Sequence, residues 1–241
     1  MRNPWLDIPD EDYVGHMSSP TVGQRPVLSR LMSEALEWAR PRTMLVLGCS
    51  TGNGLEHVNP EVTSRVTAVD LNPEYLLRLS EQFPNPGFLL DLQCADLADV
   101  VLTHEAFDLV HAALVLEYIE WPSLLPRVAS ALKPGGVLSI VLQLPSASTP
   151  AVTPSGFASL QSLESLFHFV EPGALVEAAR CEGLRLSNRR TEPVTTGKAF
   201  EVLRFVKEVS VRDRDSSPLT RRQARGVTEV VQPTRMSSKS E

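Results

Sequence analysis

The chain has 241 residues, of which 42% are hydrophobic and 22% are charged. This composition is typical of a soluble globular protein, and the length suits one domain with a substantial core. The net charge is −6, although residues 210–241 hold seven basic and four acidic side chains, so the rest of the chain is more acidic still. Because an acidic surface disfavours broad contact with phosphate backbones, we expect no nucleic-acid partner.

The cysteines and the apolar runs indicate the compartment. Cys49, Cys94 and Cys181 are odd in number and form no C-x-x-C pair, which indicates reduced thiols and implies neither a disulfide framework nor a metal site. No run approaches the roughly 18 apolar residues of a membrane span, and the N-terminus lacks the apolar centre of a signal peptide. We therefore expect a cytoplasmic protein with no membrane partner.

Residues 1–26 are interpreted as an N-terminal arm. They mix Pro, Asp, Ser and Gly with isolated large side chains, namely Trp5, Leu6, Ile8, Tyr13, His16 and Met17. A disordered tail seldom carries such anchors, so we predict an irregular segment that packs onto the domain. The domain is expected over residues 27–209, beginning with an amphipathic helix over 27–39 that ends before Pro41. Residues 210–241 lack apolar periodicity and are predicted to be disordered.

The next stretch, residues 42–54, reads Arg-Thr-Met-Leu-Val-Leu-Gly-Cys-Ser-Thr-Gly-Asn-Gly. Its apolar run at 44–47 predicts a buried strand, and the small residues after it predict a turn that a ligand can approach, followed by a helix over 54–58. The turn lacks the spacing of a dinucleotide fingerprint and the Lys of a phosphate-binding loop. It does match G-x-S-x-G, so a hydrolase with Ser50 as its nucleophile stays an alternative.

The remaining chain alternates strand and helix patterns, which predicts an α/β fold with a largely parallel sheet. The predicted strands are 65–69, 88–94, 107–111, 137–144, 184–191 and 199–207, and the predicted helices are 74–83, 122–132, 160–169 and 172–182. Asn72 is expected to cap the first of these helices, and the last two strands are close enough in sequence to be antiparallel neighbours. Ligands bind such sheets at the carboxyl ends of the strands, where Asp70, Asp96 and His111 fall. The loop at 145–159 either covers the ligand or is a plain surface loop.

The glycine-rich turn and four later motifs together resemble class I S-adenosylmethionine-dependent methyltransferases. Leu-Gly-Cys-Ser-Thr-Gly-Asn-Gly at 47–54 is similar to the first motif of that family, with Ser50 in place of the middle glycine and no acidic residue at Val46 or Leu47. Motifs at 68–74, 95–97, 107–110 and 132–136 follow in the order of the family. The resemblance covers roughly residues 28–207. It implies a Rossmann-like three-layer sandwich, with a mostly parallel seven-stranded sheet and an antiparallel last strand.

The resemblance implies S-adenosyl-L-methionine as the cofactor. By this resemblance, the cofactor-binding residues are Gly48, Cys49, Ser50, Gly52, Asp70, Leu71, Asp96, Leu97 and His111. Asp70 is expected to accept both hydroxyls of the ribose, the alternative being that it only caps the loop. Asp96 is expected to bind the adenine amino group, with Asp99 as a competing carboxylate. In this family an N-terminal arm often folds over the cofactor as a lid, whereas the alternative is a purely structural arm.

Transfer of a methyl group from a sulfonium needs alignment and exclusion of water, and it needs a base only when the acceptor must lose a proton. The candidate catalytic residues are His111 first, then Glu117, Tyr118, Tyr13 and His16. The predicted function is in-line methyl transfer to a small-molecule acceptor, at an oxygen, nitrogen or carbon that the sequence does not specify. A non-catalytic or regulatory cofactor-binding module is the main alternative. A protein side chain as the acceptor is a further one.

Overall fold

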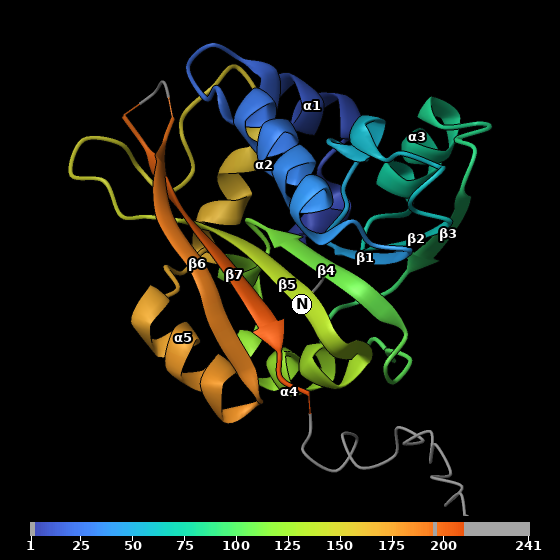
Figure 1. Cartoon of the computed structure of the whole chain (residues 1–241). Helices are drawn as coiled ribbons and strands as arrows, with labels where there is room; N and C mark the ends of the chain where they lie inside the picture. Colours follow the sequence, from blue (N-terminus) through green and yellow to red (C-terminus); the bar gives the residue numbers. More distant parts are fainter. Residues whose placement is uncertain (1–2, 195–196, 210–241) are drawn as a thin grey trace, which may run out of the picture. The chain divides into compact units, whose positions relative to one another are not determined.

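The computed structural model describes residues 3–194 and 197–209, which belong to one compact unit. The tail predicted to be disordered, residues 210–241, lies outside the described residues. Seven strands form a single sheet in the order β3-β2-β1-β4-β5-β7-β6 (Figure 1). Their bounds are β1 Thr43–Leu47, β2 Arg65–Asp70, β3 Leu89–Cys94, β4 Phe107–Ala113, β5 Leu132–Gln143, β6 Leu184–Pro193 and β7 Ala199–Lys207.

The strand directions confirm the predicted fold class. Strands β1 to β5 run parallel to one another, whereas β7 is antiparallel to both β5 and β6. The strand order reverses direction at β1 and β4, and such a switch point opens a crevice at the carboxyl ends of the two strands. This crevice is where the fold positions a ligand.

Helices cover both faces of the sheet (Figure 1). The helices α2, Gln24–Ala39, and α3, Pro73–Gln82, pack on one face, while α4, Trp121–Ala131, and α5, Pro172–Cys181, pack on the other. Along β1, Met44 and Val46 face the α2 side, and Leu45 and Leu47 face the α4 side. All four are buried, which explains why β1 reads as an uninterrupted apolar run.

The prediction of an irregular N-terminal arm is wrong. The arm contains a 3-10 turn, η1, at Pro4–Asp7, and a helix, α1, at Asp10–Ser18, and α2 begins at Gln24 rather than at residue 27. The first turn of α1 is acidic, which suits a helix N-terminus, and Asp10 forms an ion pair of 2.8 Å with Arg78 of α3. Because α1 has only a weak apolar face, contacts with the rest of the fold stabilise it more than its own periodicity does. Its packing onto the domain was predicted, and Ile8 and Met17 are buried.

Two predicted helices are 3-10 segments instead. The turn after β1 leads only into η2, Leu55–His57, because Asn59 precedes a proline and disfavours a continued helix. Residues 158–165 form η4, Ala158–Ser165, in which serine hydroxyls donate to main-chain carbonyls three residues earlier and compete with α-helical bonding. The strand β5 begins at Leu132, within the segment expected to end α4. No helix within the described ranges is long and apolar enough to cross a membrane.

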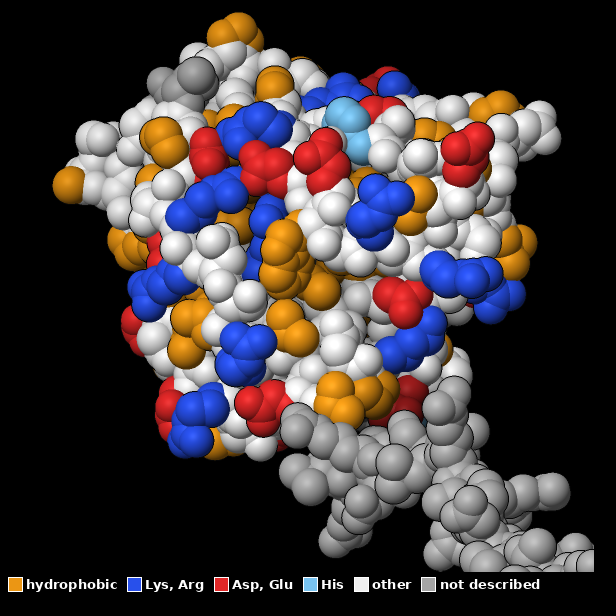
Figure 2. Space-filling view, in the orientation of Figure 1, with side chains coloured by type: hydrophobic (Ala, Val, Ile, Leu, Met, Phe, Trp, Pro, Cys, Tyr) orange, Lys and Arg blue, Asp and Glu red, His pale blue; other side chains and the backbone are white. Residues whose placement is uncertain are grey.

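Charged side chains of both signs are interspersed on the face shown in Figure 2. Several are paired across elements: Arg30 of α2 contacts Glu192 of β6 at 2.6 Å and Glu34 at 2.8 Å, and Arg190 also contacts Glu34. These pairs join α2 to the strand at the edge of the sheet.

Candidate functional site

A hollow lies at the carboxyl ends of β1, β2 and β4, and the N-terminal arm forms one of its walls. It contains about 710 Å³ of unfilled space, part of it open to solvent. Six residues predicted to bind the cofactor line it together: Gly48, Ser50, Asp70, Leu71, Asp96 and Leu97. The order of the strands therefore brings motifs from three separate loops to one cavity.

Asp70, at the end of β2, connects the glycine-rich turn after β1 to the loop after β2. Its Oδ2 accepts a hydrogen bond of 2.7 Å from the main-chain N–H of Ser50, and its Oδ1 accepts one of 2.9 Å from that of Asn72. Burial raises the pKa of Asp70, and these N–H donors oppose the rise. Each carboxylate oxygen has a second lone pair, so capping the turn leaves Asp70 able to accept ligand hydroxyls.

The turn after β1 has a left-handed backbone where it meets the hollow. Gly48 has φ +66°, and a Cβ there would lie 2.7 Å from a methyl group of Val115. Ser50 has φ +48° although it has a side chain. A glycine adopts this conformation without strain, which explains the glycine at this position in the family that the sequence resembles. Ser50 therefore adds backbone strain at a position where a glycine would have none.

A buried hydroxyl group in the hollow, the phenol of Tyr75 in the first turns of α3, lacks a hydrogen-bond partner within the described residues. The Oγ of Ser50 lies beside the phenol of Tyr13 and lowers the pKa of that phenol, against the larger effect of burial. Buried polar groups are normally satisfied, so a polar ligand is the partner that this arrangement fits. The Ser50 hydroxyl, with no imidazole bonded to it, lacks the general base that the hydrolase alternative requires.

The structure distinguishes the two candidate carboxylates that follow β3. Asp96 lines the hollow, and its Oδ1 accepts a hydrogen bond of 2.8 Å from the N–H of Ala98. Asp99 is exposed and does not line it. Leu71 and Leu97 line the same cavity as Asp96, as expected for an apolar enclosure of a base.

Aromatic side chains connect the arm to the wall of the hollow. The Trp5 ring lies 5.0 Å from the ring of Tyr118 and 6.1 Å from that of Tyr13, which in turn lies 5.3 Å from Tyr75. Burial raises the pKa of both Tyr13 and Tyr118, so both phenols are neutral at pH 7. A neutral phenol can donate or accept a hydrogen bond but is a poor base.

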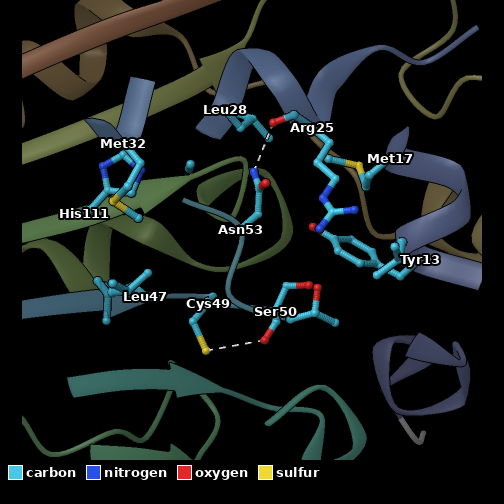
Figure 3. Close-up of a pocket in the computed structure, with 15 residues that line it drawn as sticks. Tyr13, Met17, Arg25, Leu28, Met32, Leu47, Cys49, Ser50, Asn53 and His111 are labelled. Atoms are coloured by element: carbon cyan, nitrogen blue, oxygen red, sulfur yellow. Dashed lines mark hydrogen bonds between the residues drawn. The ribbon is translucent and has the colours of Figure 1, made fainter. Parts of the chain in front are cut away.

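His111 lies in an adjoining hollow toward α2 (Figure 3). The prediction that β4 ends at His111 is wrong, because Ala112 and Ala113 continue the pairing with β5. His111 is buried and lines the same hollow as Met32, and its Nδ1 lies 3.1 Å from the Ser139 hydroxyl. Burial lowers its pKa to about 4, so the imidazole is neutral at pH 7.

The remaining predicted cofactor residues lie outside the main hollow. Cys49 lines the adjoining hollow with His111, next to Gly48 and Ser50, which line both. Gly52 lines neither cavity, and a Cβ there would lie 3.0 Å from the Leu79 side chain of α3. The glycine at this position is explained by its φ of +88° and by helix packing.

A third hollow adjoins the main one, and the two share five lining residues, Trp5, Tyr13, Met17, Leu114 and Tyr118. His16 lines it, with its Nδ1 2.8 Å from the Ser155 hydroxyl. Burial, followed by the charge of Lys198, lowers the pKa of His16 to about 4. Sequence reasoning missed the polar residues around it, which are Gln24, Gln143, Thr153 and Lys198. They come from four different segments, and none belongs to a recognisable motif.

The chain shows similarity to known proteins over its central part. Residues 45–140 match the family described as a methyltransferase domain. Over 96 residues the chain is 35% identical to trans-aconitate 2-methyltransferase of Variovorax paradoxus (strain S110), an alignment that covers 39% of this chain and 36% of that protein. The chain thus matches about a third of the length of that curated relative.

Solved structures show the same fold. The N-methyltransferase NodS from Bradyrhizobium japonicum WM9, solved in complex with S-adenosyl-L-homocysteine, is similar with a TM-score of 0.59 and 19% identity, covering 79% of this chain and 89% of that one. The [4+2]-cyclase SpnF is similar with a TM-score of 0.60 and 14% identity, covering 84% and 99%. A fold shared by these two proteins does not by itself fix one reaction.

Proposed function

We propose that this chain, which belongs to the class I S-adenosylmethionine-dependent methyltransferases, transfers the methyl group of S-adenosylmethionine to a small-molecule acceptor. The observation that carries the proposal is the main hollow. There Asp70 and Asp96 line a cavity at the switch point of the sheet, together with the Ser50 side chain and the unpartnered hydroxyl of Tyr75. These are the polar groups that a nucleoside with a polar tail would satisfy.

Each lining residue has a proposed role toward the cofactor. Asp70 accepts hydrogen bonds from the ribose hydroxyls, and Asp96 accepts one from the adenine amino group. Leu71 and Leu97 enclose the base, while the main chain at Gly48 and Ser50 lies along the methionine part. The bound cofactor supplies a methyl group that is already activated by its positively charged sulfur.

The protein itself aligns the acceptor and excludes water. Trp5 and Tyr13 of the arm wall the main hollow, and both also line the third hollow, which has the position of an acceptor pocket. Closure of such a wall protects the reaction from solvent and holds the acceptor in line. A small acceptor suits this arrangement because the adjoining cavity is lined by buried side chains on several sides.

Among the proposed catalytic residues, His16 has the most suitable place. It lines the third hollow as a neutral imidazole, whereas His111 is buried in the adjoining hollow and hydrogen-bonded to Ser139. Tyr13 and Tyr118 line both the main and the third hollow and position the acceptor. A base is required only for an acceptor that loses its proton early, so His16 is proposed for that case alone.

The proposal is tested by calorimetric binding of S-adenosylhomocysteine to the wild type and to Asp70→Asn. Loss of charge-assisted hydrogen bonds to the ribose should weaken binding about 10- to 100-fold. Asp99→Asn is the matched control, because Asp99 is exposed outside the hollow, and its affinity should equal that of the wild type. Unchanged affinity in Asp70→Asn would remove Asp70 from the site.

Methyl transfer is tested separately from binding. The wild type is incubated with S-adenosylmethionine carrying a labelled methyl group and a panel of small acids, amines and phenols, and labelled products are measured. Tight cofactor binding without any labelled product would favour the alternative, a non-catalytic or regulatory module. The absence of nucleic-acid partners and the cytoplasmic location stay predictions.

A further inference from the structure

The third hollow contains a buried lysine without an acidic partner. Lys198, which directly precedes β7, is only 3% exposed. Its Nζ donates to the carbonyl of Ala151 at 2.7 Å and to the Oε1 of Gln143 at 3.3 Å. Among the described residues, no carboxylate forms an ion pair with this ammonium group. An ammonium group has three donors, so one remains for another acceptor.

The groups that hydrogen-bond Lys198 directly are polar but neutral. Gln143 Oε1 also accepts from Gln24 Nε2 at 3.2 Å, and Gln143 Nε2 donates to the carbonyl of Ala151 at 2.9 Å. These bonds fix the amide of Gln143 with its oxygen toward the lysine. The carboxyl group that touches this network is Glu117, which accepts from the main-chain N–H of Gln143 and forms no ion pair with Lys198. The direct hydrogen-bond partners of the ammonium group are therefore an amide oxygen and a main-chain carbonyl, and not a carboxylate.

A second observation in the same hollow indicates a missing acceptor. The Oγ1 of Thr153 is buried and has no hydrogen-bond partner within the described residues, although Thr153 is only 8% exposed. His16, which also lines this hollow, is neutral at pH 7 because its pKa is lowered to about 4. An unpaired ammonium and an unsatisfied hydroxyl in one cavity are each costly to bury. One anionic ligand would satisfy both.

Resting on the proposed function, we propose that the third hollow binds the methyl acceptor as a small carboxylic acid, with its carboxylate paired to Lys198 and hydrogen-bonded by Thr153. Another part of the wall is apolar or aromatic and includes Leu160, Leu163 and Phe167. An acid with an apolar body therefore fits this cavity. Its carboxylate would contact Lys198 and Thr153, and its body would contact the apolar side chains. Lys198 is a specificity-determining residue in this arrangement, because it binds the acceptor away from the group that receives the methyl.

The chemistry of the cavity selects against neutral analogues. A primary amide has nearly the shape of the acid but brings no charge, so it leaves the buried ammonium without a counter-ion. Burial lowers the pKa of Lys198 to about 8, so the amine is still mostly protonated at pH 7. An ion pair with the ligand would raise the pKa of Lys198 again. At about pH 8, ligand binding would therefore be accompanied by uptake of a proton by the Lys198 amine.

The experiment compares acids with their own amides in the presence of S-adenosylhomocysteine. Benzoate, cinnamate and octanoate, each beside its carboxamide, are titrated into wild-type protein and into Lys198→Met by calorimetry. Lys207→Met is the matched control, since Lys207 lies at the opposite end of β7, where it donates to the carbonyl of Leu132. Binding of S-adenosylhomocysteine to each variant reports on folding and on the cofactor site.

The expected result is that at least one acid binds the wild type about 10- to 100-fold more tightly than its amide. This preference should vanish in Lys198→Met and persist in Lys207→Met, while the cofactor affinity of all three proteins is the same. Acids that bind no better than their amides, or an acid preference that survives Lys198→Met, would overturn the inference. Failure of the wild type to bind S-adenosylhomocysteine would instead contradict the proposed function. If Lys198→Met does not fold, Lys198→Gln replaces it with the same expected outcome.

Discussion

The side-chain amide of Asn72 donates a hydrogen bond of 2.9 Å to the main-chain carbonyl of Trp5, 67 residues earlier in the chain. The same nitrogen lies 3.3 Å from the carbonyl of Ile8, while the amide oxygen caps α3 by accepting from the N–H of Glu74 at 2.9 Å. Asn72 follows Asp70 by two residues, and its main-chain N–H donates to that carboxylate. One side chain thus joins the N-terminal arm to the loop that carries the proposed ribose-binding residue.

Substitution of Asn72 separates its two functions. Serine can still cap α3 but cannot reach the arm, so Asn72→Ser should destabilise the protein by about 1–3 kcal/mol and release the arm. Asn72→Ala also removes the cap and should cost about 1 kcal/mol more. Urea unfolding measures the stability, and chymotrypsin cleavage after Trp5 or Tyr13 measures the release. Equal stability and equal cleavage in the wild type and Asn72→Ser would show that this bond does not hold the arm.

The arm should become more ordered when the cofactor binds, because Trp5 and Tyr13 line the main hollow. We expect amide hydrogen exchange across α1 to slow several-fold on addition of S-adenosylhomocysteine, since ligand contacts oppose local opening. Exchange in α5, which packs on the other face of the sheet, serves as the internal control. If α1 exchanges at the same rate with and without cofactor and acceptor, the arm is a structural segment and not a lid.

Relief of the left-handed backbone at Ser50 should stabilise the protein. Ser50→Gly removes the strain of a positive φ, and we expect a gain of about 1 kcal/mol in the free energy of unfolding. Glu105→Gly is the control, because Glu105 also has a positive φ, of +46°, but is exposed outside the hollow. Both variants should gain stability in urea unfolding. A destabilised Ser50→Gly protein would mean that the serine side chain stabilises the empty turn.

Glu117 should give the protein a specific dependence on pH. Burial raises the pKa of this carboxyl group from 4.5 to about 7, against the opposing hydrogen bond from the N–H of Gln143. Between pH 4.5 and about pH 7, the Glu117 carboxyl group keeps its proton in the folded state and loses it in the unfolded state. The free energy of unfolding therefore falls as the pH rises through this window. The loss is on the order of 3 kcal/mol by pH 8.

The variant Glu117→Gln has no such proton to lose. Its stability relative to the wild type should therefore be greater at pH 8 than at pH 5, as measured by urea unfolding at both values. Glu120→Gln changes an exposed neighbour in the same loop and should show no such difference. A stability difference between Glu117→Gln and the wild type that is the same at pH 5 and pH 8 would place the carboxyl's pKa in its ordinary range.

The sequence by itself determined the sheet and the carboxylates of the main hollow. A parallel strand covered on both faces must be apolar throughout, which is why residues 44–47 were readable as β1. Because the strands are parallel and their order follows the resemblance, the residues at their carboxyl ends had to meet, and Asp70 and Asp96 do so. The cap at Asn72 was also readable, since it depends on residues two positions apart.

The tertiary structure alone decided the arm, the place of His111 and the third hollow. The helix α1 has only a weak apolar face, and contacts with α3 and η4 hold it. The sequence predicts His111 at the end of a strand, but in the structure it lies inside β4. Ala112 and Ala113, which have little local strand preference, continue the pairing with β5. Lys198 meets Gln143 across 55 residues. Local patterns encode which face of an element is buried, whereas a site built by loops from distant segments exists only once the sheet has brought their ends together.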